Sequence, residues 1–407
     1  MTFNTYEDAT QWLFNQLPVF QNQGAVAFKP GLDRIRALCS ILGNPQSAFP
    51  AIHVGGTNGK GSLSHMLAAV LQAHGFKTGL YTSPHLVDFR ERIRIDGRMI
   101  SKEEVLEFVN GYERMEAVEP TFFELGVAMA LDHFARHRVD IAIVEVGMGG
   151  RLDATAVVES VLTVVTNIGL DHTQYLGETR PLIAAEKAAI ARSGVPMVLG
   201  EPDNDILPVF ERICGKTGAP LYVPTVEAPA FTTDLLGAYQ KKNLRTLQEV
   251  LLHLPFNLDE QKTRNALQHV ARLTGLRGRW EILKQSPLLI TDTAHNAEGI
   301  REVMPQLLRL PARKRRIVWG MVSDKPAETI AKLLPHDAVY YLCTPNVPRG
   351  LKVETLHADW PHADKRWFSS VAEACAQALI DADDADVVYV GGSTFVVAEL
   401  LSMDVFS

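Results

Sequence analysis

Cysteine is scarce in this chain, and no long apolar run is present. The four cysteines are far apart and form no C-x-x-C pair; they are Cys39, Cys214, Cys343 and Cys375. This argues against a disulfide framework and predicts reduced, mostly structural thiols in a cytosolic protein. No apolar stretch approaches the ~20 residues that span a bilayer, and no signal-peptide pattern opens the chain. We therefore expect a cytoplasmic protein with no membrane association.

An excess of positive charge is also missing. The 40 Lys and Arg residues are outnumbered by 47 Asp and Glu residues, which gives a net charge of −7. This balance argues against nucleic acid as the main partner. Two basic clusters, Lys241-Lys242 with Arg245 and the run 313–316, are expected to be solvated surface. The chain has 407 residues, of which 46% are hydrophobic, and is longer than a domain with a single hydrophobic core usually is. We therefore expect two or three domains.

The first half of the chain alternates apolar strands with amphipathic helices. A helix over 32–42 comes first, and Gly43-Asn44-Pro45 stops it. Strands are then expected at 50–54, 78–82, 139–146, 161–168 and 195–199, with helices at 63–74, 101–114, 122–137 and 180–193. Nearly all-apolar strands in this order predict an α/β fold with a mainly parallel sheet covered on both faces.

A second alternating series follows a less regular region over 203–285, in which helices are expected around 238–253 and 259–273. The second series has strands near 288–293, 315–320, 338–343 and 386–391, and helices near 297–309, 325–334, 371–380 and 394–402. This pattern predicts a small doubly wound domain. We place the boundary at about 285, which gives domains 1–285 and 286–407.

Residues 55–62, Gly-Gly-Thr-Asn-Gly-Lys-Gly-Ser, form a glycine-rich loop between an apolar strand and a helical pattern. A strand, such a loop and a helix bring free backbone N–H groups and a positive helix end to one point, which predicts a phosphate site. Lys60 can reach the terminal phosphates, and Ser62 offers a hydroxyl to magnesium. The strict pattern G-x-x-x-x-G-K-[ST] is not met, because Val54 and Gly61 depart from it. A tight structural turn is the alternative.

Polar residues follow three of the expected strands. Ser83 comes after one, Glu145 directly after the next, and Asp171-His172 shortly after the third. Ligands of open α/β sheets bind beyond the carboxyl ends of the strands, so these groups should share the edge that carries the glycine-rich loop. An oxygen-rich set beside a triphosphate suits magnesium, and a histidine is an acceptable addition. The alternatives are a buried ion pair for Glu145 and a hydrogen-bonded core histidine for His172; Ser83 alone is uninformative.

Three further positions are of interest. Lys187 is a surface lysine by default, but its alanine-rich helix suggests partial burial, which would lower its pKa and make it reactive. Asp292-Thr293-Ala294-His295-Asn296 ends the first strand of the second domain, although Asp292 alone could be only a helix cap. Arg279, in the linker, is placed to touch both domains.

Together these motifs resemble folylpolyglutamate synthase/dihydrofolate synthase, a family of the ATP-dependent muramyl ligase superfamily. The motifs lie in family order over nearly the whole chain: G-T-N-G-K-G-S rather than G-T-N-G-K-T-T, and the segments 81–86, 145–155, 170–173, 186–188, 292–296 and 391–393. The departures from the strict nucleotide loop are this family's own form of it.

The resemblance implies a P-loop-type, mainly parallel ATPase domain and a smaller Rossmann-like C-terminal domain that closes over ATP and glutamate. It implies that ATP phosphorylates a pteroate or folate carboxylate, and that the amine of L-glutamate attacks the acyl phosphate to form an amide. The expected function is glutamate addition to tetrahydrofolate, and also to dihydropteroate, in folate biosynthesis. Only small-molecule partners are implied, and we expect a monomer.

The resemblance also implies roles for individual residues. Thr57, Asn58, Gly59, Lys60, Gly61 and Ser62 match the ATP phosphate loop, and Ser83, Glu145 and His172 match magnesium ligands. Lys187 matches a lysine that family members carry as a carbamate; with Lys60, His172 and Glu145 it makes up the expected catalytic set. Asn243, Arg279 and Asp292 match ATP contacts, with His295 supporting them, and Thr121, Phe122, Phe123, Glu124 and Asp153 match the pterin-side pocket. Whether a monovalent cation such as K⁺ also binds is left open.

One departure and two rivals qualify this interpretation. Bifunctional members often carry an acidic segment such as D-L-G-L where this chain has Lys29-Pro30-Gly31-Leu32, so polyglutamylation is the better supported activity. A murein peptide ligase is disfavoured by Gly61, by the segment 81–85, and by the ~50 residues before the loop, which leave little room for a UDP-sugar domain. A nucleotide-operated switch is disfavoured by Glu145, His172 and Lys187 together, because a switch needs no second metal site.

Overall fold

The computed structural model describes residues 2–17, 31–323, 327–356, 360–362 and 364–403. Its packing divides the chain into two compact units, one of Met1–Asp234 with Gln240–Leu276 and one of Leu235–Tyr239 with Arg277–Ser407. The division falls before the boundary expected at 285, because strand β9 (Glu281–Gln285) pairs antiparallel with β10 (Leu288–Thr291) of the second unit. Lys29 and Pro30 lie outside the described residues.

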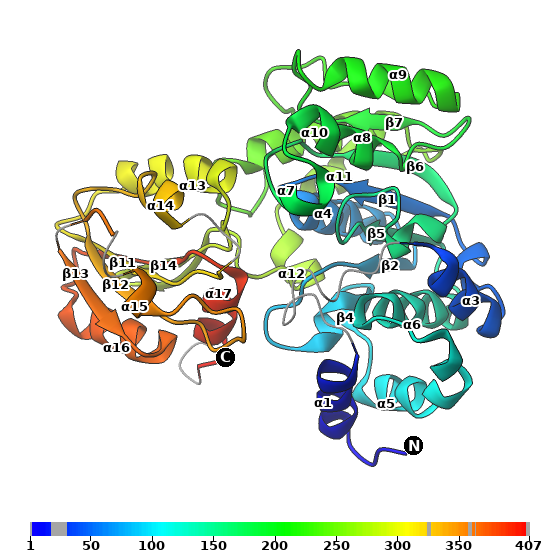
Figure 1. Cartoon of the computed structure of the whole chain (residues 1–407). Coiled ribbons are helices and arrows are strands. Elements are labelled where there is room, and N and C mark those ends of the chain that lie inside the picture. Colours follow the sequence, from blue (N-terminus) through cyan, green and yellow to red (C-terminus); the bar gives the residue numbers. More distant parts are fainter. Residues whose placement is uncertain (1, 18–30, 324–326, 357–359, 363, 404–407) are drawn as a thin grey trace. The chain divides into compact units, whose positions relative to one another are not determined.

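The first unit is built on an eight-stranded sheet in the order β4-β3-β2-β5-β1-β6-β7-β8 (Figure 1). The strands are β1 (Ala51–Gly55), β2 (Thr78–Tyr81), β3 (Ile93–Ile95), β4 (Arg98–Met99), β5 (Ile141–Glu145), β6 (Ser160–Val165), β7 (Met197–Leu199) and β8 (Leu221–Tyr222). Six neighbouring strands pair in parallel, in the order β2, β5, β1, β6, β7 and β8. β3 and β4 extend the sheet beyond β2 with antiparallel pairing. The mainly parallel sheet is therefore confirmed.

Helices cover both faces of this sheet. They are α1 (Tyr6–Gln16), α3 (Asp33–Ile41), α4 (Lys60–Ala73), α5 (Lys102–Asn110), α6 (Phe122–His137), α7 (Thr173–Leu176), α8 (Arg180–Ala188), α9 (Leu207–Thr217), α10 (Gln240–Leu252), α11 (Glu260–Leu267) and α12 (Val270–Thr274). Helix α4 contacts β1, β2 and β5 and packs with α10, α11 and α12. On the other face, Phe134 of α6 packs with Ala142 and Val144 of β5, so the central strands are buried from both sides.

The second unit has a six-stranded sheet in the order β13-β12-β11-β14-β10-β9, parallel except for β9. Its remaining strands are β11 (Arg315–Trp319), β12 (Val339–Cys343), β13 (Lys365–Phe368) and β14 (Val387–Gly391); its helices are α13 (Ala297–Arg309), α14 (Ala327–Ala331), α15 (Val353–Leu356), α16 (Val371–Asp381) and α17 (Thr394–Leu401). Two apolar clusters lie against the sheet, one around Ile300 and Trp319 and one around Val318 and Ala374. Because Val318 and Trp319 are adjacent on β11, the clusters occupy opposite faces.

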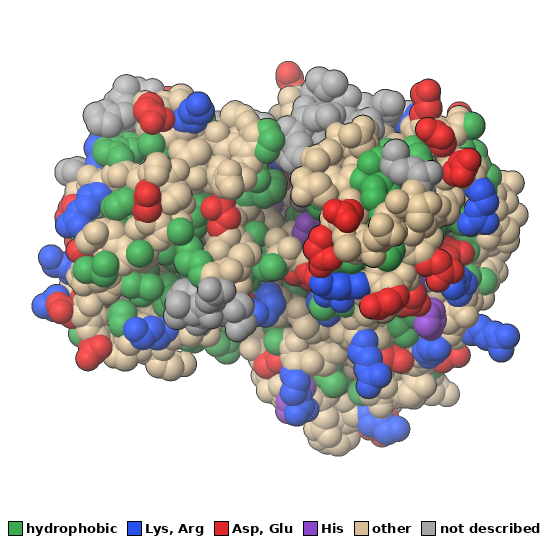
Figure 2. Space-filling model, turned by 90° about the horizontal axis from the view of Figure 1, so that it is seen from below, with side chains coloured by type: hydrophobic (Ala, Val, Ile, Leu, Met, Phe, Trp, Pro, Cys, Tyr) green, Lys and Arg blue, Asp and Glu red, His purple; other side chains and the backbone are tan. Residues whose placement is uncertain are grey.

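Among the residues that the structure describes, no helix is long and apolar enough to cross a bilayer. Figure 2 shows acidic and basic side chains interspersed over the face that it presents.

Candidate functional site

The glycine-rich loop leaves β1 at Gly55 and enters the first turn of α4, which Lys60, Gly61 and Ser62 form. Gly56 and Gly59 have φ angles of 140° and 83°, which L side chains rarely adopt. The first N–H groups of a helix have no acceptor within the helix, so the start of α4 offers donors to an anion.

The segment after β6 holds this loop in place. The backbone N–H groups of Thr57 and Asn58 donate to Asn167, at 3.0 Å to its carbonyl oxygen and 2.9 Å to Oδ1. Thr166 Oγ1 donates to the carbonyl oxygen of Asn58 at 2.6 Å, and the N–H of Gly169 donates to Thr57 Oγ1 at 3.0 Å. Thr166 and Asn167 were not among the expected site residues. Their position directly after a parallel strand could have indicated that they lie at the binding edge of the sheet.

Helix α10 packs its first turn against the same loop. Asn243 is buried there, and its Nδ2 donates to Gln240 Oε1 at 2.7 Å. Gln240 Nε2 in turn donates to Ser62 Oγ at 3.2 Å. The structure therefore brings Asn243 and Ser62 to the loop, and it gives the Ser62 hydroxyl a partner within the protein.

The close approach of α10 predicts a specific effect of Gly59→Ala. A Cβ at Gly59 would lie 2.3 Å from Asn243 Oδ1, whereas a Cβ at Gly75, which has a similar φ of 87°, meets nothing within 4 Å. Gly75→Ala should therefore cost only the left-handed strain of about 1–2 kcal/mol in the free energy of unfolding. Gly59→Ala should cost more, because Asn243 must move, and should weaken ATP binding roughly tenfold or more. Thermal unfolding and nucleotide titration of both variants check this; equal ATP affinities would contradict it.

Two lysines converge on one carbonyl oxygen of the loop. Lys60 Nζ donates to the carbonyl oxygens of Gly56 and Thr57 at 3.1 Å each, and Lys187 Nζ donates to that of Gly56 at 2.9 Å. Lys187 is only 5% exposed, so the alternative of a surface lysine is wrong. Burial, aided by the charge of Lys60, lowers the pKa of Lys187 to about 7, although Asp171 and Asp153 oppose the shift. A substantial fraction of this amine is therefore uncharged, and nucleophilic, at neutral pH.

The lowered pKa predicts how Lys187→Met changes stability with pH. Between pH 7 and the ordinary value of 10.5, the unfolded chain binds a proton at Lys187 that the folded chain does not. The free energy of unfolding of the native protein should therefore rise with pH across this window. Below pH 7 the protein bears the full cost of burying the protonated Lys187. In CO₂-depleted buffer, Lys187→Met should raise the thermal midpoint at pH 7 by at least about 2–4 °C. The difference should shrink as the pH approaches 10; a difference independent of pH would contradict it.

Glu145 and Ser83 meet at the ends of two neighbouring parallel strands. Glu145 ends β5, is 4% exposed, and its Oε2 accepts the N–H of Ser83 at 3.1 Å. Arg92 is buried nearby: burial lowers its pKa, while Tyr81 and Glu145 oppose the shift. Arg92 is thus close enough for its charge to interact with that of Glu145. A buried carboxylate at the edge that carries the phosphate loop is also a ligand that fits Mg²⁺.

The Asp171-His172 segment follows Gly169, which is hydrogen-bonded to Thr57 of the loop. His172 has a φ of 51°, precedes α7, and donates its backbone N–H to Asp171 Oδ1 at 2.9 Å. Asp171 is close enough for its charge to raise the pKa of Lys187. The carboxylate of Asp171 therefore lies near Lys187, and its oxygen atoms are of the kind that a divalent cation prefers.

The five residues expected at the pterin side lie in the first unit, and three of them, Thr121, Glu124 and Asp153, form hydrogen bonds within the protein. Thr121 caps α6, and both its N–H and its Oγ1 donate to Glu124 Oε2 at 2.8 Å. Asp153 accepts the N–H groups of Met148 and Thr155 at 2.9 and 3.0 Å, and burial raises its pKa.

The two aromatic residues expected at the pterin side, Phe122 and Phe123, lie next to Arg92 and Gly147, respectively. The guanidinium of Arg92 lies 5.2 Å from the ring centroid of the buried Phe122. A Cβ at Gly147 would lie 2.4 Å from the Phe123 ring and 3.1 Å from Asp153 Oδ2, so Phe123 and Asp153 both flank Gly147. Only glycine fits between them. Arg92 was missed by sequence reasoning, because a strand-edge arginine has no distinguishing pattern.

Arg279, Asp292 and His295 gather around Thr293 in the second unit. Arg279 donates to Thr293 Oγ1, and His295 Nδ1 lies 2.9 Å from the Thr293 carbonyl oxygen. Asp292 is 2% exposed and accepts bonds from Tyr239 Oη and the Trp280 N–H at 2.7 Å each. It does not cap α13, since Asn296 accepts the N–H of Gly299 there; the helix-cap alternative for Asp292 is wrong.

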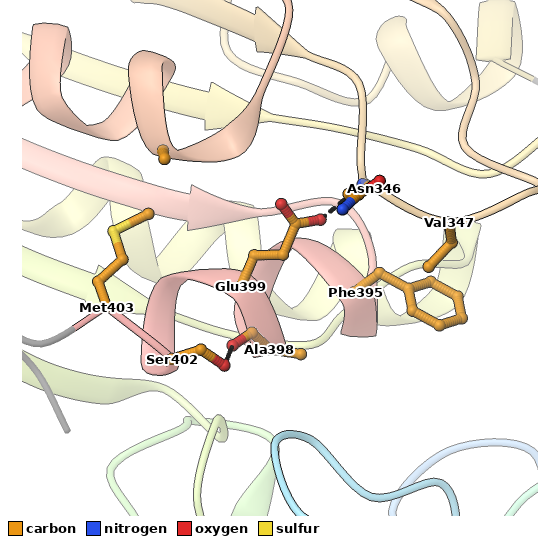
Figure 3. Close-up of a pocket in the computed structure, with 8 residues that line it drawn as sticks. Asn346, Val347, Phe395, Ala398, Glu399, Ser402 and Met403 are labelled. Atoms are coloured by element: carbon orange, nitrogen blue, oxygen red, sulfur yellow. Dashed lines mark hydrogen bonds between the residues drawn. The ribbon is translucent and has the colours of Figure 1, made fainter. Parts of the chain in front are cut away.

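A separate pocket of about 300 Å³ lies on α17 in the second unit (Figure 3). Its lining consists of Asn346, Val347, Ala372, Phe395, Ala398, Glu399, Ser402 and Met403. Glu399 accepts the N–H of Asn346 at 2.7 Å across it. None of the expected site residues lines this pocket, so it is not part of the expected site.

Comparison with known proteins now identifies the family. The Mur ligase middle domain matches residues 54–205, and the Mur ligase glutamate ligase domain matches 278–394. The chain is 33% identical over 410 residues to dihydrofolate synthase/folylpolyglutamate synthase of Escherichia coli, covering 96% of this chain and 95% of that one. The chain belongs to the folylpolyglutamate synthase/dihydrofolate synthase family. It is thus an ATP-dependent ligase, and the predicted fold class and family are confirmed.

Further similarities agree with this family. The Haloferax volcanii probable bifunctional folylpolyglutamate synthase/dihydropteroate synthase is 36% identical, and the chain spans 50% of its length. The structure of E. coli FolC in complex with DHPP and ADP has a TM-score of 0.86 at 30% identity, covering 98% of this chain and 97% of that one. A Yersinia pestis family member complexed with AMPPNP and Mn ion has a TM-score of 0.86 at 31% identity, covering 98% of both chains. The relatives named here are folate enzymes, not murein peptide ligases.

Proposed function

We propose that this chain uses ATP to add L-glutamate to tetrahydrofolate, and also to dihydropteroate, through an acyl phosphate. The observation that carries the proposal is the convergence of Lys60 and Lys187 on Gly56, at the sheet edge where Glu145 is buried. Phosphoryl transfer depends on positioning and charge neutralisation, which these groups provide. The DHPP, ADP and AMPPNP–Mn bound by the relatives support the same assignment.

Each proposed step assigns work to residues of this chain. The start of α4 and Lys60 hold the phosphates of ATP, and Glu145, Ser83 and His172 hold Mg²⁺. When bound, Mg²⁺ neutralises charge on the transferring phosphoryl group. That group passes to the substrate carboxylate and leaves ADP. The amine of glutamate then attacks the acyl carbon and loses a proton, so that an amide forms and phosphate departs. No side chain of the protein has to act as the nucleophile.

Lys187 would contribute as a carbamate. Its uncharged amine attacks CO₂, a C–N bond forms, and one proton is released. The product is an additional carboxylate between the loop and Asp171. The pKa of about 7 supports this role, because an amine with the ordinary pKa of 10.5 stays protonated at neutral pH.

The remaining assignments rest on family motifs. We propose that Asn243, Arg279 and Asp292 contact ATP, that His295 supports them, and that Thr121, Phe122, Phe123, Glu124 and Asp153 shape the pterin-side pocket. We also propose that the first domain binds MgATP and folate and that the second closes over ATP and glutamate. Small-molecule substrates, a monomer, and a cytoplasmic location without nucleic-acid partners complete the proposal; the net charge of −7 supports the last point.

Phosphate release with MgATP and L-glutamate tests this function, with tetrahydrofolate, dihydropteroate or a UDP-muropeptide as acceptor. We expect release with tetrahydrofolate and dihydropteroate and none with the muropeptide. Since the basic segment Lys29-Pro30 replaces an acidic one, tetrahydrofolate should give the higher rate. Release with the muropeptide alone would overturn the folate assignment, and no release with any acceptor would overturn the proposed activity.

A further inference from the structure

Three potential metal ligands converge where α5 packs on α6. Glu104 lies on α5, and His133 and His137 lie one turn apart on α6. Glu104 Oε1 is 3.2 Å from His133 Nδ1 and 2.6 Å from His137 Nε2, and the three ligand atoms lie within 4.8 Å of one another. All three side chains therefore aim one donor atom at the same point.

The spacing of these atoms suits a small transition-metal ion. Tetrahedral zinc with bonds of about 2.0–2.1 Å holds its ligand atoms about 3.3 Å apart. The contact between Glu104 and His133 already has this separation, and that between Glu104 and His137 has to lengthen by less than about 1 Å. Two histidines at i and i+4 are a recurrent way to bind zinc from one helix face.

The surroundings also favour ligation. The other oxygen of Glu104, Oε2, accepts the backbone N–H of Ser101 at 3.1 Å, which fixes the carboxylate and leaves Oε1 for the cation. Arg136 lies close enough for its charge to act on His133, but it is paired with Glu107 at 3.2 Å, which reduces its repulsion of a cation.

We propose that Glu104, His133 and His137 form a Zn²⁺ site, with water as the fourth ligand, that joins α5 to α6. A histidine–nitrogen and carboxylate–oxygen set selects Zn²⁺ over Mg²⁺, which prefers oxygen ligands alone. This site is built from different residues than the Mg²⁺ set of Ser83, Glu145 and His172. It is a structural site: it ties two helices together, with one position open to solvent through the half-exposed His137. Without metal, His133 and His137 both contact the same carboxylate oxygen of Glu104.

The test uses metal-free full-length protein titrated with Zn²⁺ in excess Mg²⁺, which occupies the hard-oxygen set. His137→Ala is the main variant, because its side chain is 42% exposed and the fold should tolerate the loss. His253→Ala is the matched control: His253 Nε2 lies 2.9 Å from Glu249 Oε1, and among the residues that the structure describes this pair belongs to no cluster of three potential ligands. We expect the wild type and His253→Ala to bind Zn²⁺ with equal affinity, and we expect Zn²⁺ to raise the thermal midpoint of both. His137→Ala should bind Zn²⁺ roughly tenfold or more weakly, and Zn²⁺ should no longer raise its thermal midpoint.

A second measurement locates the ion. A crystal soaked in Zn²⁺ should give an anomalous peak about 2.0–2.2 Å from Glu104 Oε1, His133 Nδ1 and His137 Nε2. Unchanged Zn²⁺ affinity in folded His137→Ala would overturn the proposal. So would a folded wild type that binds no Zn²⁺, or a peak confined to other residues.

Discussion

Lys60→Ala is expected to lower the rate of folate-dependent phosphate release by about 10²–10³-fold. Lys60 is the loop side chain that can neutralise the terminal phosphates, and loss of one donor aimed at developing charge costs about 10²–10³ in kcat. In this structure Lys60 Nζ donates to the carbonyl oxygens of Gly56 and Thr57, so its charge is already held at the loop. Steady-state kinetics at saturating acceptor and glutamate measure the loss.

The control for this variant is Lys332→Ala. Lys332 is exposed, and its ammonium group pairs with Glu328 at 2.6 Å. Its removal should leave the rate unchanged, while both variants keep the thermal midpoint within a few degrees of the wild type. Lys60→Ala with a wild-type rate would show that the glycine-rich loop is only a structural turn.

Lys187→Ala is expected to lower the rate by about 10²-fold or more and to recover partly with added formate or acetate. The alanine variant removes the amine that forms the proposed carbamate and leaves space beside Gly56, which a short carboxylate can enter. Rates measured against carboxylate concentration should rise and saturate.

Lys187→Gln provides the matched control. Glutamine can still donate a hydrogen bond to the Gly56 carbonyl oxygen, but it cannot form a carbamate and leaves little space. It should be as inactive as the alanine variant and should not respond to formate. Full activity of Lys187→Gln would reduce the role of Lys187 to the 2.9 Å hydrogen bond that the structure shows.

Much of the fold follows from local patterns in the sequence. The helix expected over 122–137 is α6 with the same bounds, because the Thr121 and Glu124 capping box marks its start. The inner parallel strands were recognisable as apolar runs bounded by turns. The short strands β3, β4 and β8 were missed, because strands of two or three residues carry too little periodicity, and the edge strand β13 was missed as well. β9 was missed because its sequence, Glu-Ile-Leu-Lys-Gln, is neither an apolar run nor a regular alternation of apolar and polar residues; it pairs antiparallel with β10.

The candidate site was predictable to a smaller extent. The glycines and Lys60 stand out because they form a phosphate-binding loop between a strand and a helix. Glu145 stands out because it follows an apolar strand. The burial of Lys187 depends on the packing of α8 against the loop, and no local pattern reports that. Likewise, Gln240 and Asn243 reach the loop from almost 180 residues downstream. Contacts of this range are set by the tertiary fold rather than by neighbouring residues.

The most direct test of this account is a crystal structure with AMPPNP and Mg²⁺. We predict the phosphates of the analogue against the backbone N–H groups of residues 57–62 and Lys60, with the cation about 2.0–2.1 Å from a carboxylate oxygen of Glu145. A nucleotide bound elsewhere, or a cation remote from Glu145 with the loop empty, would contradict it.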